Sequence, residues 1–298
     1  MSVGMRLNWI NRQNSPARSI ALGTFDGVHL GHQKLLEETI ARKPAGGTSC
    51  VFTFDIPPEQ YFRGRLRLVS SFERRVELFR SSGIDEVTWL TFGPDLTTMA
   101  AEDFVGRILV HELKAKAVIC GYNYRFGSKR GGDVQYLQKQ GEHHGFSVTV
   151  VPPVQGKSGQ TISSTAIRQL LSEGDLAQAS AYLGYYPTYE AAVGQLSIGS
   201  SLYLRIDPNL VLPGQGLYLI WCALPGSQGV PAIAWPVDEG IKSVFLDRDF
   251  ELRAEAVDVQ FLYKLRGYGP YQVTESDVVK ARQLLPGFYL QDARVVLK

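Results

Sequence analysis

Short apolar runs alternate with amphipathic stretches over the first 185 residues, and this alternation restricts the possible folds more than any other feature. The apolar runs have the length of buried strands. They are 19–23, 48–54, 86–92, 117–121 and 146–151. Residues at helical spacing lie between them, such as Phe72, Val76 and Phe79. The pattern predicts a Rossmann-like α/β fold, a parallel sheet with helices on both faces, which binds ligands beyond the carboxyl ends of its strands.

A different pattern begins after Pro187. Short runs with β character follow, separated by Gly, Pro and Asp, at 189–193, 201–206, 216–223, 230–235, 242–246 and 254–262. Six such runs predict a small six-stranded antiparallel β-barrel. Residues 276–285 then predict a C-terminal helix, with Ser276 as its N-cap and Pro286-Gly287 as its stop. We therefore expect two domains, 1–186 and 187–298, in agreement with a length of 298 residues.

Composition excludes several classes of protein. The chain has 31 basic and 29 acidic side chains, so a net charge of +2 argues against a nucleic-acid partner. Cys50, Cys120 and Cys222 are far apart and predict reduced thiols in a cytoplasmic protein. The longest bulky apolar run, Leu217–Leu224, is too short to cross a bilayer, and the N-terminus has no signal pattern. We expect no membrane partner.

The segment Gly23–His32 follows a predicted strand and opens a predicted helix over Gln33–Arg42. A helix start offers free N–H groups and a partial positive charge to a phosphate. Glycines in this turn, Gly27 and Gly31, let the backbone approach such a ligand. The histidines His29 and His32 are three apart, so they lie on one helix face and suit stabilisation of a phosphoryl centre during in-line displacement. The alternative is that His29 caps the helix while His32 packs in the core.

Two further clusters carry candidate binding groups. Ser163, Ser164 and Thr165 precede or open a helix that runs to Leu171, and Arg168 lies one turn later. Hydroxyls with an arginine are suited to a triphosphate, although the same hydroxyls are ordinary N-caps. The loop 121–132 follows the fourth strand and combines aromatic rings, an amide and three cations. It suits a planar ring and a phosphate, or is a solvated loop.

Together, the phrases GTFDGVHLGH, ISSTAIR and GYNYRFG resemble the nucleotidyltransferase domain of bacterial FAD synthetases, which is usually joined to a riboflavin kinase. The resemblance covers about the first 185 residues. It implies transfer of AMP from ATP to FMN with Mg²⁺, giving FAD and pyrophosphate. The catalytic residues that it implies are His29, His32 and Arg168. The ATP-binding residues that it implies are Gly23, Thr24, Phe25, Asp26, Gly27, Gly31, Ser163, Ser164 and Thr165. The flavin-binding residues that it implies are Thr53, Phe54, Asn123, Arg125 and Phe126.

Two departures limit what the resemblance carries over. Tyr124 stands where Phe is commoner in the family, and Asp55-Ile56-Pro57-Pro58 replaces a Pro-His-Pro run, so no histidine role applies there.

The second half resembles the riboflavin kinase barrel, but Ile198–Asp207 lacks the kinase's Gly-Phe-Pro-Thr-Ala-Asn ending. Lys242 aligns with the kinase's catalytic Glu and cannot take a proton as a carboxylate does. We therefore expect a monofunctional FAD synthetase, with a bifunctional enzyme as the alternative.

Three other functions compete with this interpretation. A transferase of the same fold acting on another acceptor, such as phosphopantetheine, is disfavoured by the aromatic loop and the barrel. A class I aminoacyl-tRNA synthetase also uses a His-x-Gly-His turn, but it needs a Lys-rich second motif and a basic face. A non-catalytic flavin-binding protein would not need all three motifs of the first half.

Overall fold

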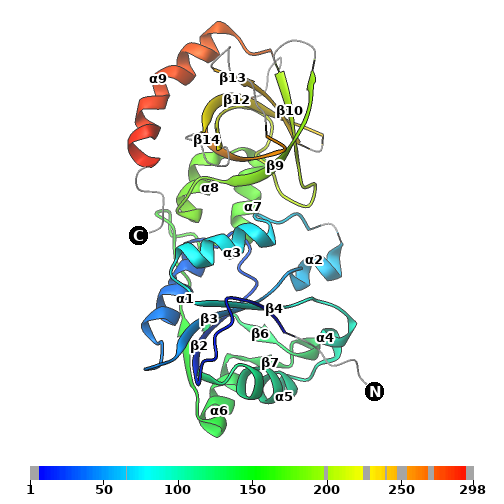
Figure 1. Ribbon diagram of the computed structural model, residues 1–298, viewed down its shortest axis with the longest axis vertical. Coiled ribbons are helices and arrows are strands. Elements are labelled where there is room, and N and C mark those ends of the chain that lie inside the picture. The colour runs from blue at the N-terminus through cyan, green and yellow to red at the C-terminus, as the bar shows by residue number, and fades with distance from the viewer. Residues whose placement is uncertain are drawn as a thin grey trace. The chain divides into compact units, whose positions relative to one another are not determined.

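The computed structural model describes residues 7–64, 66–197, 201–223, 229–238, 240–246, 254–267 and 272–292. The chain forms two compact units (Figure 1). The first contains residues up to 66 together with 72–162, and the second contains 67–71 together with the residues from 163 onward. Residues 163–186, which we assigned to the first domain, are thus grouped by their contacts with the second unit. The domain boundary at residue 186 remains a prediction.

The first unit is built on a six-stranded sheet of order β1-β4-β3-β2-β5-β8. Five of its strands are parallel, as the alternating pattern predicts. They are β2 (Arg18–Leu22), β3 (Thr48–Phe54), β4 (Glu86–Leu90), β5 (Ala115–Gly121) and β8 (Ser147–Val151). The sixth, β1 (Asn8–Ile10), pairs antiparallel with β4 at the edge and was not predicted, because three residues are too few to show a period.

Helices cover both faces of this sheet. Figure 1 shows α1 (Leu30–Ala41) and α3 (Phe72–Ser81) on one side and α5 (Ala101–Asp103) and α6 (Val134–His144) on the other. The α5 helix continues into the π-helix η1 (Phe104–Glu112), whose apolar residues pack with Ile20 and Leu22 of β2. The unit also contains α2 (Pro58–Arg63), α4 (Pro94–Thr98), the 3₁₀ turn η2 (Ser128–Arg130) and the small hairpin of β6 (Arg125–Phe126) and β7 (Gly132–Asp133).

The second unit contains a closed barrel of order β10-β13-β12-β11-β14-β9, in which all neighbours are antiparallel. This confirms the predicted six-stranded barrel. Its strands are β9 (Thr188–Ser197), β10 (Ser201–Ile206), β11 (Leu217–Ala223), β12 (Val230–Val237), β13 (Gly240–Phe245) and β14 (Ala256–Arg266). Helices α7 (Ser164–Glu173) and α8 (Leu176–Leu183) precede the barrel.

The C-terminal helix is present, but both of its predicted ends are wrong. Helix α9 spans Glu275–Asp292, and Thr274 caps it by exchanging hydrogen bonds with Asp277. Pro286 lies inside the helix and does not end it. Beyond the proline the ring of Phe288 packs on Tyr186 at 5.8 Å, so apolar packing offsets the main-chain hydrogen bond that proline removes.

Candidate active site

The turn between β2 and α1 brings the two predicted histidines to the carboxyl end of the central strand. The helix begins at Leu30, earlier than predicted, so His29 is its N-cap. Phe25, Gly27 and Val28 have φ angles of 54°, 79° and 35°. Glycine adopts such values freely, whereas a bulky or β-branched residue is strained there. Strain of this kind concentrates at functional sites, and here it shapes the turn that carries the imidazoles.

His29 does cap the helix, which was the structural alternative for this residue. Its Nδ1 accepts the main-chain N–H of His32 at 3.3 Å. An imidazole that accepts through Nδ1 carries its proton on Nε2, so the cap fixes the tautomer and leaves Nε2–H as a donor. The residue is only 6% exposed, and burial lowers its pKa to about 4. At neutral pH His29 is therefore uncharged.

His32 stacks on His29 with ring centroids 3.7 Å apart and planes inclined by 17°. The ring of Phe25 meets it edge-on at 5.2 Å. Burial lowers the pKa of His32 well below its usual value, and the charges of His29 and Arg75 lower it further. The buried Nδ1 of His32 has no hydrogen-bond partner, an arrangement that costs free energy and needs a functional or structural explanation. The two rings form a neutral, stacked pair that offers hydrogen bonds, not positive charge.

Gly31 serves the histidine pair in a way that the sequence did not suggest. We expected this glycine to let the backbone approach a phosphate. A Cβ at this position would lie 3.0 Å from Cε1 and 3.1 Å from Nδ1 of His29, tighter than ordinary contact. The space beside Gly31 is thus occupied by the His29 imidazole, and any side chain there would displace the ring.

Thr53 and Phe54, at the end of β3, lie beside this turn. The hydroxyl of Thr53 donates to the carbonyl oxygen of Thr24 at 3.3 Å and is fully buried. Sequence reasoning missed Arg75 of α3, which donates to the carbonyl oxygens of Thr24 and Phe54 at 2.7 and 3.0 Å. A cation on the same helix face as three apolar residues was the signal that could have revealed it.

An aromatic cluster at the carboxyl ends of β3 and β4 was also missed. It consists of Phe54, Tyr61, Phe62 and Phe92, whose rings meet edge-on with centroids 5.3–5.8 Å apart. Phe62 is 67% exposed, which is unusual for so large an apolar side chain. The adjacent aromatic residues Tyr61 and Phe62, in a short helix that Pro57-Pro58 opens, were a visible signal. The cluster offers partly exposed aromatic rings at the carboxyl ends of β3 and β4.

The loop after β5 places its predicted flavin-binding residues in three different environments. Asn123 is exposed. Arg125 pairs with Asp133 at 2.6 Å, and Asp133 also caps α6. Phe126 is buried in the core, where its ring packs at 5.3 Å from Phe104. Their role at a flavin remains a prediction.

The predicted triphosphate residues belong to the second compact unit. Ser163 caps α7 by accepting the N–H of Ala166 at 3.2 Å, as the capping alternative expected. The guanidinium of Arg168 donates to the hydroxyl of Thr165 at 3.1 Å. Their binding role stays a prediction.

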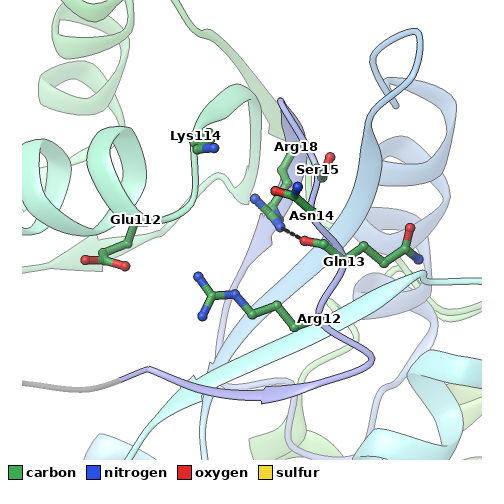
Figure 2. A pocket seen from close by; sticks show the side chains of 7 residues that line it. All are labelled: Arg12, Gln13, Asn14, Ser15, Arg18, Glu112 and Lys114. Atoms are coloured by element: carbon green, nitrogen blue, oxygen red, sulfur yellow. Dashed lines mark hydrogen bonds between the residues drawn. The ribbon is translucent and has the colours of Figure 1, made fainter.

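A cavity of about 290 Å³ lies at the other end of the sheet (Figure 2). Arg18, at the start of β2, and Glu112 and Lys114, just before β5, line it together with residues 12–15. Arg18 is already engaged by Glu86 and by the carbonyl oxygen of Gln13. Ligands of parallel sheets bind at the carboxyl ends of the strands, so the histidine turn and not this cavity is the candidate site.

No group of three or more His, Cys, Asp or Glu side chains among the residues that the structure describes could hold a metal ion. None of the helices within that part of the chain has both the length and the apolar character needed to cross a membrane.

A parallel sheet whose first strand-to-helix turn presents two stacked imidazoles matches the nucleotidyltransferase fold that the motifs predict. A model of the FAD synthetase family matches residues 11–166. Because that is more than half of the chain, the protein belongs to the FAD synthetase family. This confirms the family indicated by the sequence motifs.

Individual relatives agree with the family. A bifunctional riboflavin kinase/FMN adenylyltransferase of Escherichia coli (strain K12) is 33% identical over 72% of this chain and 71% of its own length. One from Buchnera aphidicola subsp. Acyrthosiphon pisum (strain APS) is 33% identical over 55% of this chain. The chain spans about half the length of that protein (53%). A crystal structure of a macrolide-efflux protein from Streptococcus pneumoniae has a TM-score of 0.76 at 22% identity over 94% of each chain, a likeness of fold alone.

Proposed function

We propose that this protein transfers AMP from ATP to FMN, giving FAD and pyrophosphate, at the turn between β2 and α1. The observation that carries the proposal is the neutral, stacked pair of His29 and His32 at the start of α1. A phosphate oxygen of FMN attacks the α-phosphorus in line while pyrophosphate leaves, and no covalent intermediate with the protein forms. Imidazole N–H groups donate to the phosphate oxygens and stabilise the charge that develops there.

Neutral imidazoles suit this task because the burial that keeps them neutral also strengthens the hydrogen bonds that they donate. His29 is only 6% exposed, so a hydrogen bond from its Nε2–H to a phosphate oxygen is stronger than one at the surface. The partial positive charge at the start of α1 acts in the same direction. Mg²⁺ would enter with ATP as part of the substrate, since Mg²⁺ in such sites takes many of its ligands from phosphates and water.

The aromatic cluster of Phe54, Tyr61, Phe62 and Phe92 supports a flavin as the acceptor. A flavin ring is planar and apolar on its faces, and aromatic side chains bind such rings by stacking. The cluster lies in the same compact unit as the histidine turn, at the ends of β3, which pairs with β2, and of β4, the next strand beyond β3. The roles of Asn123, Arg125 and Phe126 at the flavin, and of Ser163, Ser164, Thr165 and Arg168 at the triphosphate, rest on the sequence motifs.

Product analysis tests the proposal directly. The protein is incubated with FMN, ATP and Mg²⁺, and the products are identified by mass spectrometry. We expect FAD and pyrophosphate from the wild type and a loss of roughly 10²-fold or more in kcat for His32→Ala, with FMN binding retained. His111→Ala is the matched control, because His111 is 82% exposed and lies far along the chain in η1. No FAD from the wild type, or equal activity of both variants, would contradict the proposal; product from phosphopantetheine alone would indicate another acceptor.

The barrel unit supports a monofunctional enzyme. Lys242, which aligns with the kinase's catalytic Glu, lies on β13 opposite Tyr203 and Trp235 of the neighbouring strands. The stretch that lacks the kinase motif overlaps β10, and residues 198–200 of it, like Asp247 of the Leu-Asp pair used for the alignment, lie outside the described residues. Incubation with riboflavin, ATP and Mg²⁺ should yield no FMN. Formation of FMN at an ordinary turnover rate would establish the bifunctional alternative.

We also assign the protein to the cytoplasm. All three cysteines are buried and unpaired, which suits a reducing compartment. Burial raises the pKa of Cys120 and of Cys222 to about 12, so neither thiol ionises near neutral pH.

A further inference from the structure

Arg75 is a fully buried cation beneath the histidine turn, with 0% of its surface exposed. It lies on α3 among apolar side chains, and its guanidinium stands 5.3 Å from the ring of Phe72. Burial of a guanidinium is costly unless every donor finds a partner. The Nε–H of Arg75 has no hydrogen-bond partner, so its burial carries a free-energy cost that an apolar side chain would not.

The hydrogen bonds of Arg75 join two segments that are far apart in the sequence. Nη1 donates to the carbonyl oxygen of Thr24 at 2.7 Å and to that of Phe54 at 3.0 Å. Nη2 donates to the carbonyl oxygen of Asp55 at 2.7 Å. One rigid, planar group therefore fixes the start of the strained turn against the end of β3.

A second residue of α3, Phe79, also holds the turn in place. Phe79, one turn after Arg75, meets the ring of Phe25 edge-on at 5.3 Å, and Phe25 in turn contacts His32. The same turn contains the residues with positive φ, so without external contacts its backbone would relax. Helix α3 thus supports the position of His32 through one polar and one aromatic contact.

We propose that Arg75 is a positioning residue for the transfer reaction: its guanidinium holds the strained turn in place and thereby fixes the position of the His32 imidazole. This inference rests on the proposed function. It concerns a residue that touches neither substrate, so its effect passes through His32.

The charge of Arg75 shifts the pKa of His32 in a predictable direction. The titratable groups around the pair are His29 on α1, Asp26 in the turn, Asp55 after β3, and Glu73 and Arg75 on α3. Among them Arg75 and His29 lower the pKa of His32, while burial is the larger cause. If Arg75 is replaced by a neutral residue, the pKa of His32 rises. Protonation of His32 then begins at a higher pH, and the acid limb of the pH profile moves with it.

Two replacements separate charge from geometry. Arg75→Gln keeps amide donors but removes the charge, and Arg75→Lys keeps the charge on a single nitrogen. We expect Arg75→Gln to lower kcat about tenfold or more, to change the KM for FMN less than threefold, and to shift the acid limb to higher pH. Arg75→Lys should keep the wild-type acid limb and recover most of kcat. Arg80→Met, an exposed position on the same helix, is the control and should match the wild type.

A proton NMR titration of His32 reads the same coupling without an activity assay. The wild type should titrate well below the ordinary value of 6.5, and Arg75→Gln should titrate closer to it. This result would stand even if the wild type made no FAD, so failure of the positioning role is distinguishable from failure of the proposed function. Wild-type kcat and an unchanged acid limb in Arg75→Gln would overturn the inference. Should that variant not fold, Arg75→Met replaces it, and a wild-type His32 that titrates at 6.5 overturns the inference by itself.

Discussion

Replacement of Gly31 by alanine should separate activity from stability. The added Cβ would lie 3.0 Å from Cε1 of His29, whereas ordinary contact begins at about 3.4 Å, so the imidazole must move by at least a few tenths of an ångström. That movement also disturbs the 3.3 Å hydrogen bond by which His29 caps α1. A displacement of about 1 Å at a reacting group costs up to roughly 10²-fold in rate. We therefore expect kcat to fall about 10- to 100-fold.

Stability should change little in the same variant. Alanine favours a helix over glycine by about 1 kcal/mol, while weakening of an N-cap costs about 0.5–2 kcal/mol. These opposite effects should leave the free energy of unfolding within about 1 kcal/mol of the wild type, as measured by urea denaturation.

Gly106→Ala is the matched control. Gly106 also lies within a helix, and nothing stands within 4 Å of the position that its Cβ would take. This variant should be as active as the wild type and equally or more stable. If Gly31→Ala folds and keeps kcat within about twofold of the wild type, the position of His29 does not govern the reaction, and the assignment of the histidine pair is wrong.

Three further outcomes can be measured. Glu86→Gln should lower the free energy of unfolding by about 3–5 kcal/mol, because Glu86 is fully buried and holds Arg18 at 2.6 Å; Glu37→Gln, on the surface, should not. The unfolded chain takes up the His29 proton near pH 6.5 but the folded protein only near pH 4, so stability should fall as pH drops through this window, by roughly 3 kcal/mol at its lower end. His29→Asn, which can still cap α1, should make that dependence less steep by removing the His29 contribution, while the buried His32 still contributes in the same direction; an equally steep dependence would contradict the assignment. Phe62→Ala should raise the KM for FMN several-fold with little loss of stability, since Phe62 is 67% exposed; an unchanged KM would remove Phe62 from the flavin site.

The sequence predicted those parts of the site that are local in the chain. The Gly-rich strand-to-helix turn with its two histidines spans only ten residues, and short-range geometry decides which way both imidazoles face. Even there the predicted helix start at Gln33 was wrong, because the helix begins at Leu30 with His29 as its N-cap. Histidine is not among the usual capping residues, so the start was hard to place from sequence.

Contacts between distant segments could not be predicted in this way. The hydrogen bonds of Arg75 join the carbonyl oxygens of residues 24, 54 and 55 to a helix that begins at Phe72. No period or motif indicates such a contact, although a lone arginine on the apolar face of a helix marks a place where one is needed. The packing of Phe126 on Phe104 is a similar case, because the two residues are far apart in the chain; the role of Phe126 at a flavin stays a prediction.

The sequence by itself determined the two architectures and the location of both imidazoles in one turn, because the period of apolar residues reports strands and helices and because ten consecutive residues hold both histidines. Only the tertiary structure decided the protonation state of those imidazoles and which residues of other segments support the turn that carries them. Burial lowers the pKa of both imidazoles, and the charge of Arg75 on another helix lowers that of His32 further, so these effects depend on which distant segments the fold brings together.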